Sequence, residues 1–197
     1  MPERTNNILS NVDDRRRKVP PQRRRLAPTI QSPEVSDAVS IRRLVHRTPA
    51  LDPNSSYAYL LLCTDFAQTS AVARVGDEVV AFVLGYCPPE RPDTYFVWQV
   101  AVSPAHRGQG LGTALLDHVI GSLRRRGITH LEATVTPSNE ASWSLFRGFA
   151  RRRGLACSER SAFPSHLFSE DDHEDEVRIT IGPLDRPQAE TDPDQEA

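Results

Sequence analysis

The central stretch of the chain changes from an apolar strand pattern to a helical one. Residues 97–102 form an apolar, β-branched run that predicts a buried strand over 94–102, and Pro104 ends it because proline cannot donate to a sheet ladder. After a glycine-rich turn, apolar positions recur with helical spacing over residues 110–126. The apolar face of that helix comprises Leu111, Gly112, Leu115, Leu116, Val119, Ile120 and Leu123.

The same patterns predict the other strands and helices of the chain. Ser32 and Pro33 indicate a helix start, with Ser32 as the cap, and Asn139 caps the last helix. Residues 153–176 are expected to be irregular, anchored by Phe163, Leu167 and Phe168. The expected strands are 29–31, 70–75, 78–87, 94–102, 130–136 and 177–181, and the expected helices are 33–47, 55–66, 110–126 and 140–152.

The two ends differ in composition from the centre. Residues 1–28 carry eight Lys and Arg against three acids, and residues 170–197 carry eleven acids against two arginines. The outermost segments lack the apolar residues that build a core. We therefore expect a disordered basic arm over residues 1–28, one domain over residues 29–184 and a disordered acidic tail over residues 185–197.

Composition excludes several classes of protein. The net charge is −2 and the centre is nearly balanced, so no nucleic-acid partner is expected, and the arginine runs of the arm are interpreted as solvated. No apolar run has transmembrane length and no secretory signal is visible. Three cysteines without paired spacing favour a reducing cytoplasm over a disulfide framework, a zinc site or any other metal site.

The glycine-rich turn has the composition of an anion cradle. The first N–H groups of a helix have no intrahelical partner, and the helix dipole adds partial positive charge there. Glycines let an anionic ligand approach the backbone, and an arginine adds a permanent cation. An ordinary turn with incidental glycines is the weaker interpretation. The predicted pyrophosphate cradle consists of Arg107, Gly108, Gln109, Gly110, Leu111 and Gly112.

The spacing in this turn excludes two common nucleotide loops. It lacks the Gly-Lys-Ser/Thr of a Walker loop and does not fit the Gly-x-Gly-x-x-Gly of a Rossmann fold. Residues 107–112, preceded by Val102-Ser103-Pro104, instead resemble the acetyl-CoA loop of the GNAT acetyltransferases. That resemblance implies acetyl-CoA as co-substrate and a central mixed, mostly antiparallel, splayed sheet flanked by helices, an α/β (α+β) fold. The predicted element order, β-α-α-β-β-β-α-β-α-β, is that of this fold.

The resemblance also assigns roles along the predicted strand 94–102. Its free edge near Val100 and Val102 would pair with the pantetheine arm, and a backbone N–H near Val100 would face the thioester oxygen. Asn139 matches the position that contacts CoA in this family.

Further blocks resemble the diaminobutyrate acetyltransferases, one family among these enzymes. The resemblance extends over about residues 29–183 and implies transfer of acetyl to the γ-amine of L-2,4-diaminobutyrate, for the synthesis of the compatible solute ectoine, by a cytoplasmic homodimer. The matching blocks are residues 51–62, 96–102, 134–139, 149–154 and 173–177.

Acetyl transfer requires a neutral amine. With a lysine-like pKa near 10, only about one amine in a thousand is neutral at pH 7, so a base must accept the proton. The candidates are Asp52, Glu132, His173 and Glu174. His173 lies among acids that raise its pKa and attract a diamine, but it is equally consistent with an exposed turn histidine, and only the resemblance favours the functional role.

Several other residues allow two interpretations. Asp52 is an amine anchor, a cap for the helix that follows, or both, while Tyr57 and Trp98 are either walls of the substrate site or core aromatics. Phe146 stands where many of these enzymes place a tyrosine that protonates the leaving thiolate. The proton would then come from Tyr57, water or the amine, or the thiolate would leave unprotonated, since a thiol pKa is near 8.5.

Two other functions compete with diaminobutyrate acetylation. The same fold could acetylate another small polyamine or a peptide amine. A non-catalytic acyl-CoA-binding regulator is the weakest alternative, for which Phe146 and the basic arm would be the clues.

Overall fold

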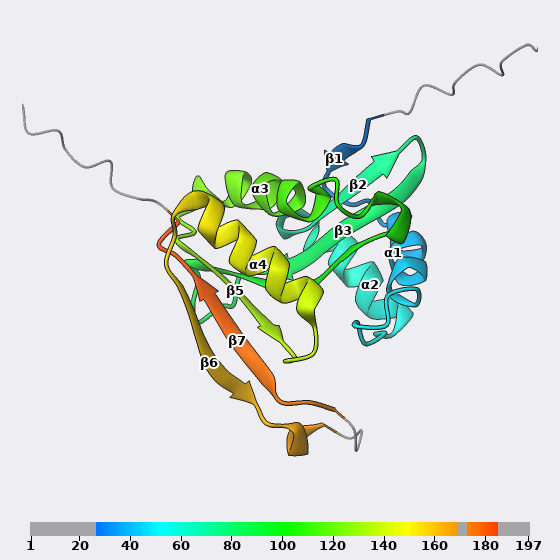
Figure 1. The fold of residues 1–197 in the computed structure, drawn as a ribbon. Helices are drawn as coiled ribbons and strands as arrows, with labels where there is room; N and C mark the ends of the chain where they lie inside the picture. The colour runs from blue at the N-terminus through cyan, green and yellow to red at the C-terminus, as the bar shows by residue number, and fades with distance from the viewer. Residues whose placement is uncertain (1–26, 169–172, 185–197) are drawn as a thin grey trace, which may run out of the picture.

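The computed structural model describes residues 27–168 and 173–184, which form a seven-stranded sheet with helices on both faces (Figure 1). The strand order is β1-β2-β3-β4-β5-β7-β6, and only β4 and β5 are parallel neighbours. The strands are β1 Thr29–Gln31, β2 Ala71–Val75, β3 Glu78–Tyr86, β4 Thr94–Val102, β5 His130–Val135, β6 Cys157–Phe163 and β7 Glu176–Ile181. The α-helices are α1 Asp37–Val45, α2 Ser56–Thr64, α3 Leu111–Arg124 and α4 Glu140–Arg153; short 3-10 turns are η1 Ala67–Thr69, η2 Pro104–His106 and η3 Ser165–Leu167.

The sheet splits along the boundary between β4 and β5. Their pairing runs from Thr94 opposite His130 to Val97 opposite Ala133 and goes no further, whereas β4 continues to Val102 against β3. On β3, Leu84 opposes Gln99 and the next residue opposes Val97, so Trp98 is the extra residue of a β-bulge. The end of the β4–β5 pairing confirms the splayed strands that the resemblance to the GNAT fold predicted.

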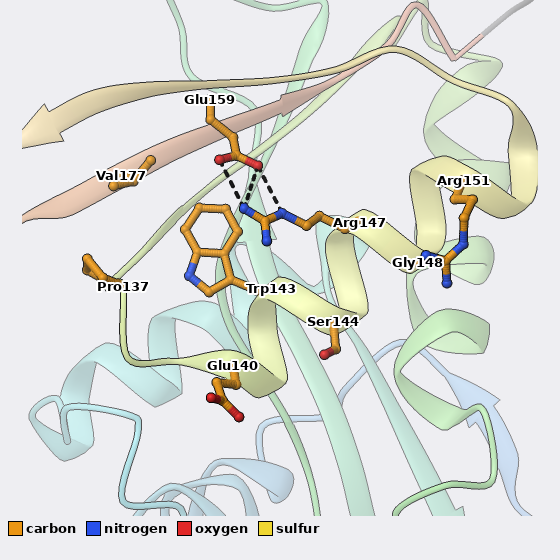
Figure 2. Close-up of a pocket in the computed structure, with 9 residues that line it drawn as sticks. All are labelled: Pro137, Glu140, Trp143, Ser144, Arg147, Gly148, Arg151, Glu159 and Val177. Carbon is orange, nitrogen blue, oxygen red and sulfur yellow. Dashed lines mark hydrogen bonds and ion pairs between the residues drawn. The ribbon is translucent and has the colours of Figure 1, made fainter.

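Strand β6 is a correction to the expected irregular segment. It pairs with β7 through backbone hydrogen bonds and extends from the body of the sheet, with η3 at its far end (Figure 1). Its side chains are almost all exposed, so no apolar alternation marks it in the sequence. Phe163 and Leu167, expected as anchors, are exposed as well. Arg147 of α4 holds β6 by a two-pronged ion pair with Glu159 (Figure 2).

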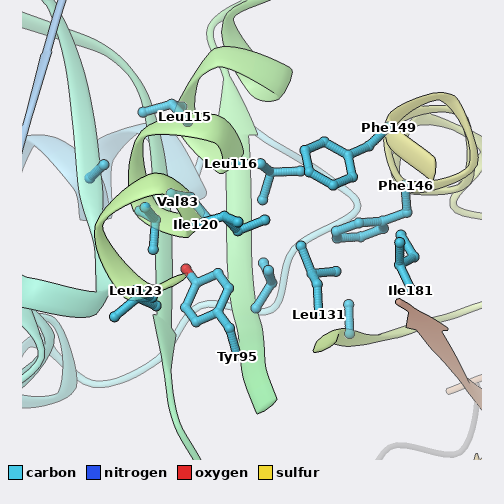
Figure 3. Packing of buried hydrophobic residues seen from close by; sticks show 14 of the residues in the cluster. Val83, Tyr95, Leu115, Leu116, Ile120, Leu123, Leu131, Phe146, Phe149 and Ile181 are labelled. Carbon is cyan, nitrogen blue, oxygen red and sulfur yellow. The ribbon is translucent and has the colours of Figure 1, made fainter. Parts of the chain in front are cut away.

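Two apolar layers cover the sheet. On one face, α3 and α4 bury a cluster that includes Tyr95 and Leu116 (Figure 3), and all apolar positions predicted for α3 are buried there. On the other face, α1 and α2 pack against Phe82 and Leu84 of β3. Each fully buried side chain of this size stabilises the fold by about 1.5–3 kcal/mol. The cluster under α1 and α2 includes residues of β2, β3 and β4 but none of β5, so this layer does not extend across the split between β4 and β5.

The first helix starts later than predicted. Ser32 does not cap it, because α1 begins at Asp37. The Asp37 carboxylate instead accepts the N–H of Glu34 and pairs with Arg74 of β2.

The other predicted elements are confirmed to within a few residues. Residues 1–26 and 185–197, where the arm and tail are predicted, lie outside the described residues.

Candidate active site

A cavity of about 770 Å³ lies where β4 and β5 part. Six parts of the chain contribute to it: the loop before α2, the end of β3 with the loop that follows, strand β4, the end of β5 with the start of α4, the end of β6 with the turn after it, and β7 with the segment that leads into it. It brings together most of the predicted acceptor-side residues, although not Tyr57. The lining residues with polar or aromatic side chains are Asp52, Asn54, Tyr86, Arg91, Phe96, Trp98, Gln99, Thr134, Thr136, Ser138, Asn139, Ser142, Phe146, Phe163, Phe168, His173, Glu174, Glu176 and Arg178.

The loop that carries Asp52 is fixed to β4 by two buried polar residues. Tyr59 Oη accepts the N–H of Asn54 at 3.1 Å and donates to Gln99 Oε1 at 3.4 Å. Gln99 Nε2 donates to the backbone carbonyl of Asp52 at 2.8 Å. Sequence reasoning missed both residues, although a glutamine within an apolar strand is a detectable signal. These bonds set the position of the Asp52 backbone beside β4.

His173 meets Asp52 at the mouth of the cavity. Its Nε2 lies 3.7 Å from Asp52 Oδ2, and its ring stacks on Phe168 with 3.6 Å between centroids. The Asp52 side chain is 91% exposed, while that of His173 is only 12% exposed. His173 Nδ1 lies 2.6 Å from the carbonyl oxygen of Glu174, which can only accept, so Nδ1 carries a proton. In the neutral ring Nε2 is therefore the proton acceptor, and it is directed toward Asp52.

The two glutamates near His173 have opposite environments. Glu174 accepts the N–H of Ser138 at 3.0 Å, and hydrogen bonding from Ser138 lowers its pKa. Glu176 is more enclosed: its Oε2 is buried and has no hydrogen-bond partner among the described residues. Burial raises the pKa of Glu176 despite a hydrogen bond from Thr134. Sequence reasoning missed Glu176 because it is one of several acids in a row, and nothing in the sequence distinguishes a buried acid from its exposed neighbours.

Glu132 is unsuited to the role of base. Its carboxylate is held by Arg91, by Arg178 Nη1 at 2.8 Å and by Thr180 Oγ1 at 3.2 Å, and it is not among the lining residues. Burial alone would raise the pKa of Glu132, but the two guanidinium groups bring it below the usual value. An ionised carboxylate committed to three donors takes up a substrate proton poorly, so the structure argues against this candidate.

The aromatic candidates fall in different places. Trp98 is 46% exposed, lies edge-on to Tyr86 and lines the cavity, so it is not a core residue. Tyr57 lies in the first turn of α2, is 67% exposed and does not line the cavity. Ser55 caps α2 by accepting the N–H of Ala58, so Asp52 is not that cap. Phe146 is buried in the apolar cluster (Figure 3). It also contributes apolar surface to the cavity wall.

The predicted cradle forms at the start of α3. Gly110 caps the helix with φ +77°, Gly108 has φ +73°, and a Cβ on either would meet open space. Because the first helical bond runs from Ala114 N–H to Gly110 O, the preceding N–H groups have no intrahelical acceptor. Gly112 differs, since a Cβ there would lie 3.1 Å from the Leu145 side chain, so this glycine permits close packing of α3 on α4.

The remaining cofactor candidates follow the split between the strands. Asn139 caps α4, accepting the N–H of Ser142 at 3.1 Å, and lines the cavity. Val100 also lines it, while Val102 pairs with Ala81 of β3 at the end of β4. Arg107 is exposed beside the cradle, with its Nε 3.4 Å from the carbonyl oxygen of Val102. An anion at the α3 N-terminus would meet free N–H groups and this guanidinium together.

A second hollow of about 630 Å³ lies between α4 and strands β6 and β7 (Figure 2). Trp143, Arg147 and Arg151 line it together with two acids, Glu140 and Glu159, and Glu159 is paired with Arg147. Within the described part of the chain, no cluster of His, Cys, Asp or Glu could hold a metal ion. Nor does any helix there have the length and apolarity needed to cross a membrane.

Comparison with known proteins identifies the family. Residues 38–149 match the acetyltransferase (GNAT) family. The chain is 45% identical over 155 residues to L-2,4-diaminobutyric acid acetyltransferase of Nocardia farcinica, covering 79% of this chain and 80% of that protein. It is 47% identical over 157 residues to the protein of that name from Streptomyces coelicolor, covering 79% and 92% of the two chains.

A solved structure is similar over the same region. Diaminobutyrate acetyltransferase EctA from Paenibacillus lautus, in complex with its substrate L-2,4-diaminobutyric acid and coenzyme A, superposes with a TM-score of 0.78 at 34% identity. The match covers 82% of this chain and 98% of that chain. The chain therefore belongs to the GNAT acetyltransferases and, among them, to the L-2,4-diaminobutyric acid acetyltransferase family.

Proposed function

We propose that this protein transfers acetyl from acetyl-CoA to the γ-amine of L-2,4-diaminobutyrate, in ectoine synthesis. The observation that carries this proposal is the cavity at the strand split, where the acceptor-side residues Asp52, Trp98, His173 and Glu176 lie together. This arrangement matches a small polar amine, because three acids that can hold ammonium groups, Asp52, Glu174 and Glu176, line one cavity.

Acetyl-CoA binds with its diphosphate at the α3 N-terminus and its thioester arm along the split. Gly108 and Gly110 leave room for the diphosphate to approach the backbone, and Arg107 supplies a cation. Beyond Val97 the edge of β4 is not paired with β5, so backbone groups near Val100 are available to the arm. Asn139 lines the same cavity. No metal is required by this chemistry.

Different residues of the cavity hold the amine and remove its proton. Asp52, together with Glu174, attracts and holds an ammonium group of the substrate at the mouth. Glu176, whose pKa is raised by burial, takes the γ-proton deeper in the cavity. His173 Nε2 then accepts the proton and passes it to solvent beside the exposed Asp52. The neutral γ-amine attacks the thioester carbonyl, with Trp98 as the wall of the site.

The leaving thiolate departs without help from Phe146. The phenyl ring of Phe146 has no ionisable proton to donate, and Tyr57 does not line the cavity. A thiol with a pKa near 8.5 is a tolerable leaving group as the thiolate, which solvent then protonates.

We also propose a homodimer in the cytoplasm. Support for the dimer comes from β6 and the turn after it, where Phe163 and Leu167 are exposed at the end of a projecting hairpin (Figure 1). A second copy would cover this apolar surface. The three cysteines Cys63, Cys87 and Cys157 are all free, as a reducing compartment would leave them. Light scattering of the purified protein tests the oligomeric state.

Release of free CoA thiol from acetyl-CoA tests the proposed function. The assay is run with L-2,4-diaminobutyrate, with other small polyamines, with a peptide amine and without acceptor. We expect thiol release that depends on L-2,4-diaminobutyrate. Preference for another amine would indicate a different acceptor on the same fold, and binding of acetyl-CoA without release under any condition would indicate a regulator.

A further inference from the structure

We infer that Arg178 binds the α-carboxylate of the acceptor and thereby selects a diamino acid over a diamine that lacks a carboxylate. This inference rests on the proposed function and deepens it, because that function requires an amine site but does not say what recognises the acid group. The acids of the cavity explain attraction of ammonium groups only.

The Arg178 guanidinium is enclosed and retains unused donors. Its side chain is 15% exposed and lines the cavity, with the rings of Phe96 and Phe163 at 5.8 and 6.0 Å from its Cζ. One hydrogen bond engages it, from Nη1 to Glu132 at 2.8 Å, and no second is found in residues 27–168 and 173–184. A guanidinium has five N–H donors, so a fork for a carboxylate remains.

Arg178 shares its carboxylate partner with a second arginine. Glu132 is shared, because the same Oε2 that accepts from Arg178 also accepts from Arg91, while Oε1 accepts from Thr180. Two guanidinium groups therefore share one hydrogen-bonded carboxylate. A substrate carboxylate would use the donors of Arg178 that Glu132 leaves free, in a partly desolvated position where such a pair is strong.

The position of Arg178 matches the length of a short diamino acid. Arg178 and Glu176 are two residues apart on β7, so their side chains project from the same face with about 7 Å between their Cα atoms. Both line the cavity. A carboxylate held at Arg178 places the amines of the same molecule toward Glu176 and the acids at the mouth. A diamine without a carboxylate gains nothing from this guanidinium.

A purely structural role for Arg178, as counter-ion of Glu132, makes a different prediction. Loss of the side chain would then lower stability and would reduce activity toward all acceptors alike. The test is the ratio of kcat/KM for L-2,4-diaminobutyrate to kcat/KM for 1,3-diaminopropane, which is the same diamine without the carboxylate. A change in the fold alone does not alter this ratio in favour of one acceptor.

For Arg178→Gln we expect kcat/KM for L-2,4-diaminobutyrate to fall by about 10- to 100-fold, mainly through KM, and kcat/KM for 1,3-diaminopropane to stay within about threefold. Arg178→Lys keeps the charge beside Glu132 but not the fork, and is expected to recover part of the ratio. Arg160→Gln is the matched control, because Arg160 opposes Arg178 in register on β6 and is exposed.

An unchanged acceptor ratio in Arg178→Gln overturns the inference. Should that variant fail to fold in a thermal melt, Arg178→Lys decides alone: a ratio equal to that of the wild type overturns the inference, and a ratio lowered about tenfold supports it. The wild-type enzyme acting on L-2,4-diaminobutyrate establishes the proposed function in either case, so the two failures are distinguishable.

Discussion

His173 Nε2 lies 3.7 Å from Asp52 Oδ2, which joins the loop before α2 to the segment before β7 across the mouth of the cavity. Each partner is held by a different part of the fold. Gln99 bonds the backbone of Asp52 to β4, and the carbonyl of Glu174 fixes the imidazole through Nδ1. The relationship places one exposed and one enclosed side chain together at the mouth of the cavity.

Asp52→Asn should keep acetyl-CoA binding and lose acceptor binding. Removing the charge weakens the charge-assisted hydrogen bond to the ammonium, so we expect kcat/KM for L-2,4-diaminobutyrate to fall by about 10- to 100-fold. Steady-state kinetics and calorimetry with acetyl-CoA measure the two effects separately. Asp65→Asn, an exposed change at the end of α2, is the control. A normal kcat/KM in Asp52→Asn would exclude the anchor.

His173→Ala should lower kcat at neutral pH by about 100-fold or more, because the relay from the cavity to solvent is lost. The deficit should shrink as pH rises, since more of the amine deprotonates unaided. A pH profile of kcat for the variant and the wild type measures this. His118→Ala, on the exposed side of α3, controls for the loss of a histidine. Wild-type kcat in His173→Ala at pH 7 contradicts the role.

Glu176→Gln should inactivate the enzyme and stabilise the fold at the same time. Because burial raises the pKa of Glu176, ionisation of this carboxyl costs folding free energy above the ordinary glutamate pKa, near 4.3. The free energy of unfolding of the wild type therefore falls as pH rises from the ordinary glutamate pKa through the raised one. The glutamine amide of the variant does not titrate, so the variant shows no such fall. Thermal melts should show a higher Tm for the variant at about pH 8 and no such gain at about pH 4.

The kinetic half of this prediction is a lower kcat for Glu176→Gln at every pH where the wild type works. A variant that is more stable and equally active would show that Glu176 is buried without taking the proton. A variant that is less stable at about pH 8 would contradict the burial argument.

Gly110→Ala should weaken acetyl-CoA binding more than its effect on the fold explains. Gly110 and Gly76 have φ +77° and +60°, and a Cβ meets open space at both. Alanine at either position costs about 1–2 kcal/mol of backbone strain. Gly76→Ala, in the β2–β3 turn, therefore matches the loss of stability without touching the cradle. Equal acetyl-CoA affinities of the two variants by calorimetry would remove the cradle assignment.

The sequence pattern predicted the elements that depend on interactions between residues close in the chain. The apolar face of α3, the hairpin between β2 and β3 and the cap at Asn139 all follow from spacing within one stretch. Strand β6 did not, because it is held by its partner strand and by Arg147 and presents polar side chains to solvent.

For the site, the sequence predicted only those residues whose side-chain type stands out from their surroundings. Asp52, His173 and Glu174 stood out, but Glu176 looked like its acidic neighbours, and the difference arises from burial in the folded chain. Glu132 has the residue type of a base, but Arg91 and Arg178, both distant in sequence, hold its carboxylate. Such outcomes depend on which side chains the sheet register brings together, and no local pattern encodes that.

The position of the acetyl group on the product tests the account most directly. The enzyme is incubated with isotope-labelled acetyl-CoA and L-2,4-diaminobutyrate, and the product is examined by NMR for coupling between the acetyl carbonyl and the amide proton next to the γ- or the α-carbon. With the carboxylate at one end of the cavity and the acids toward the other, we predict acetylation at the γ-nitrogen alone. Acetylation at the α-nitrogen, or a mixture of both products, would contradict the account.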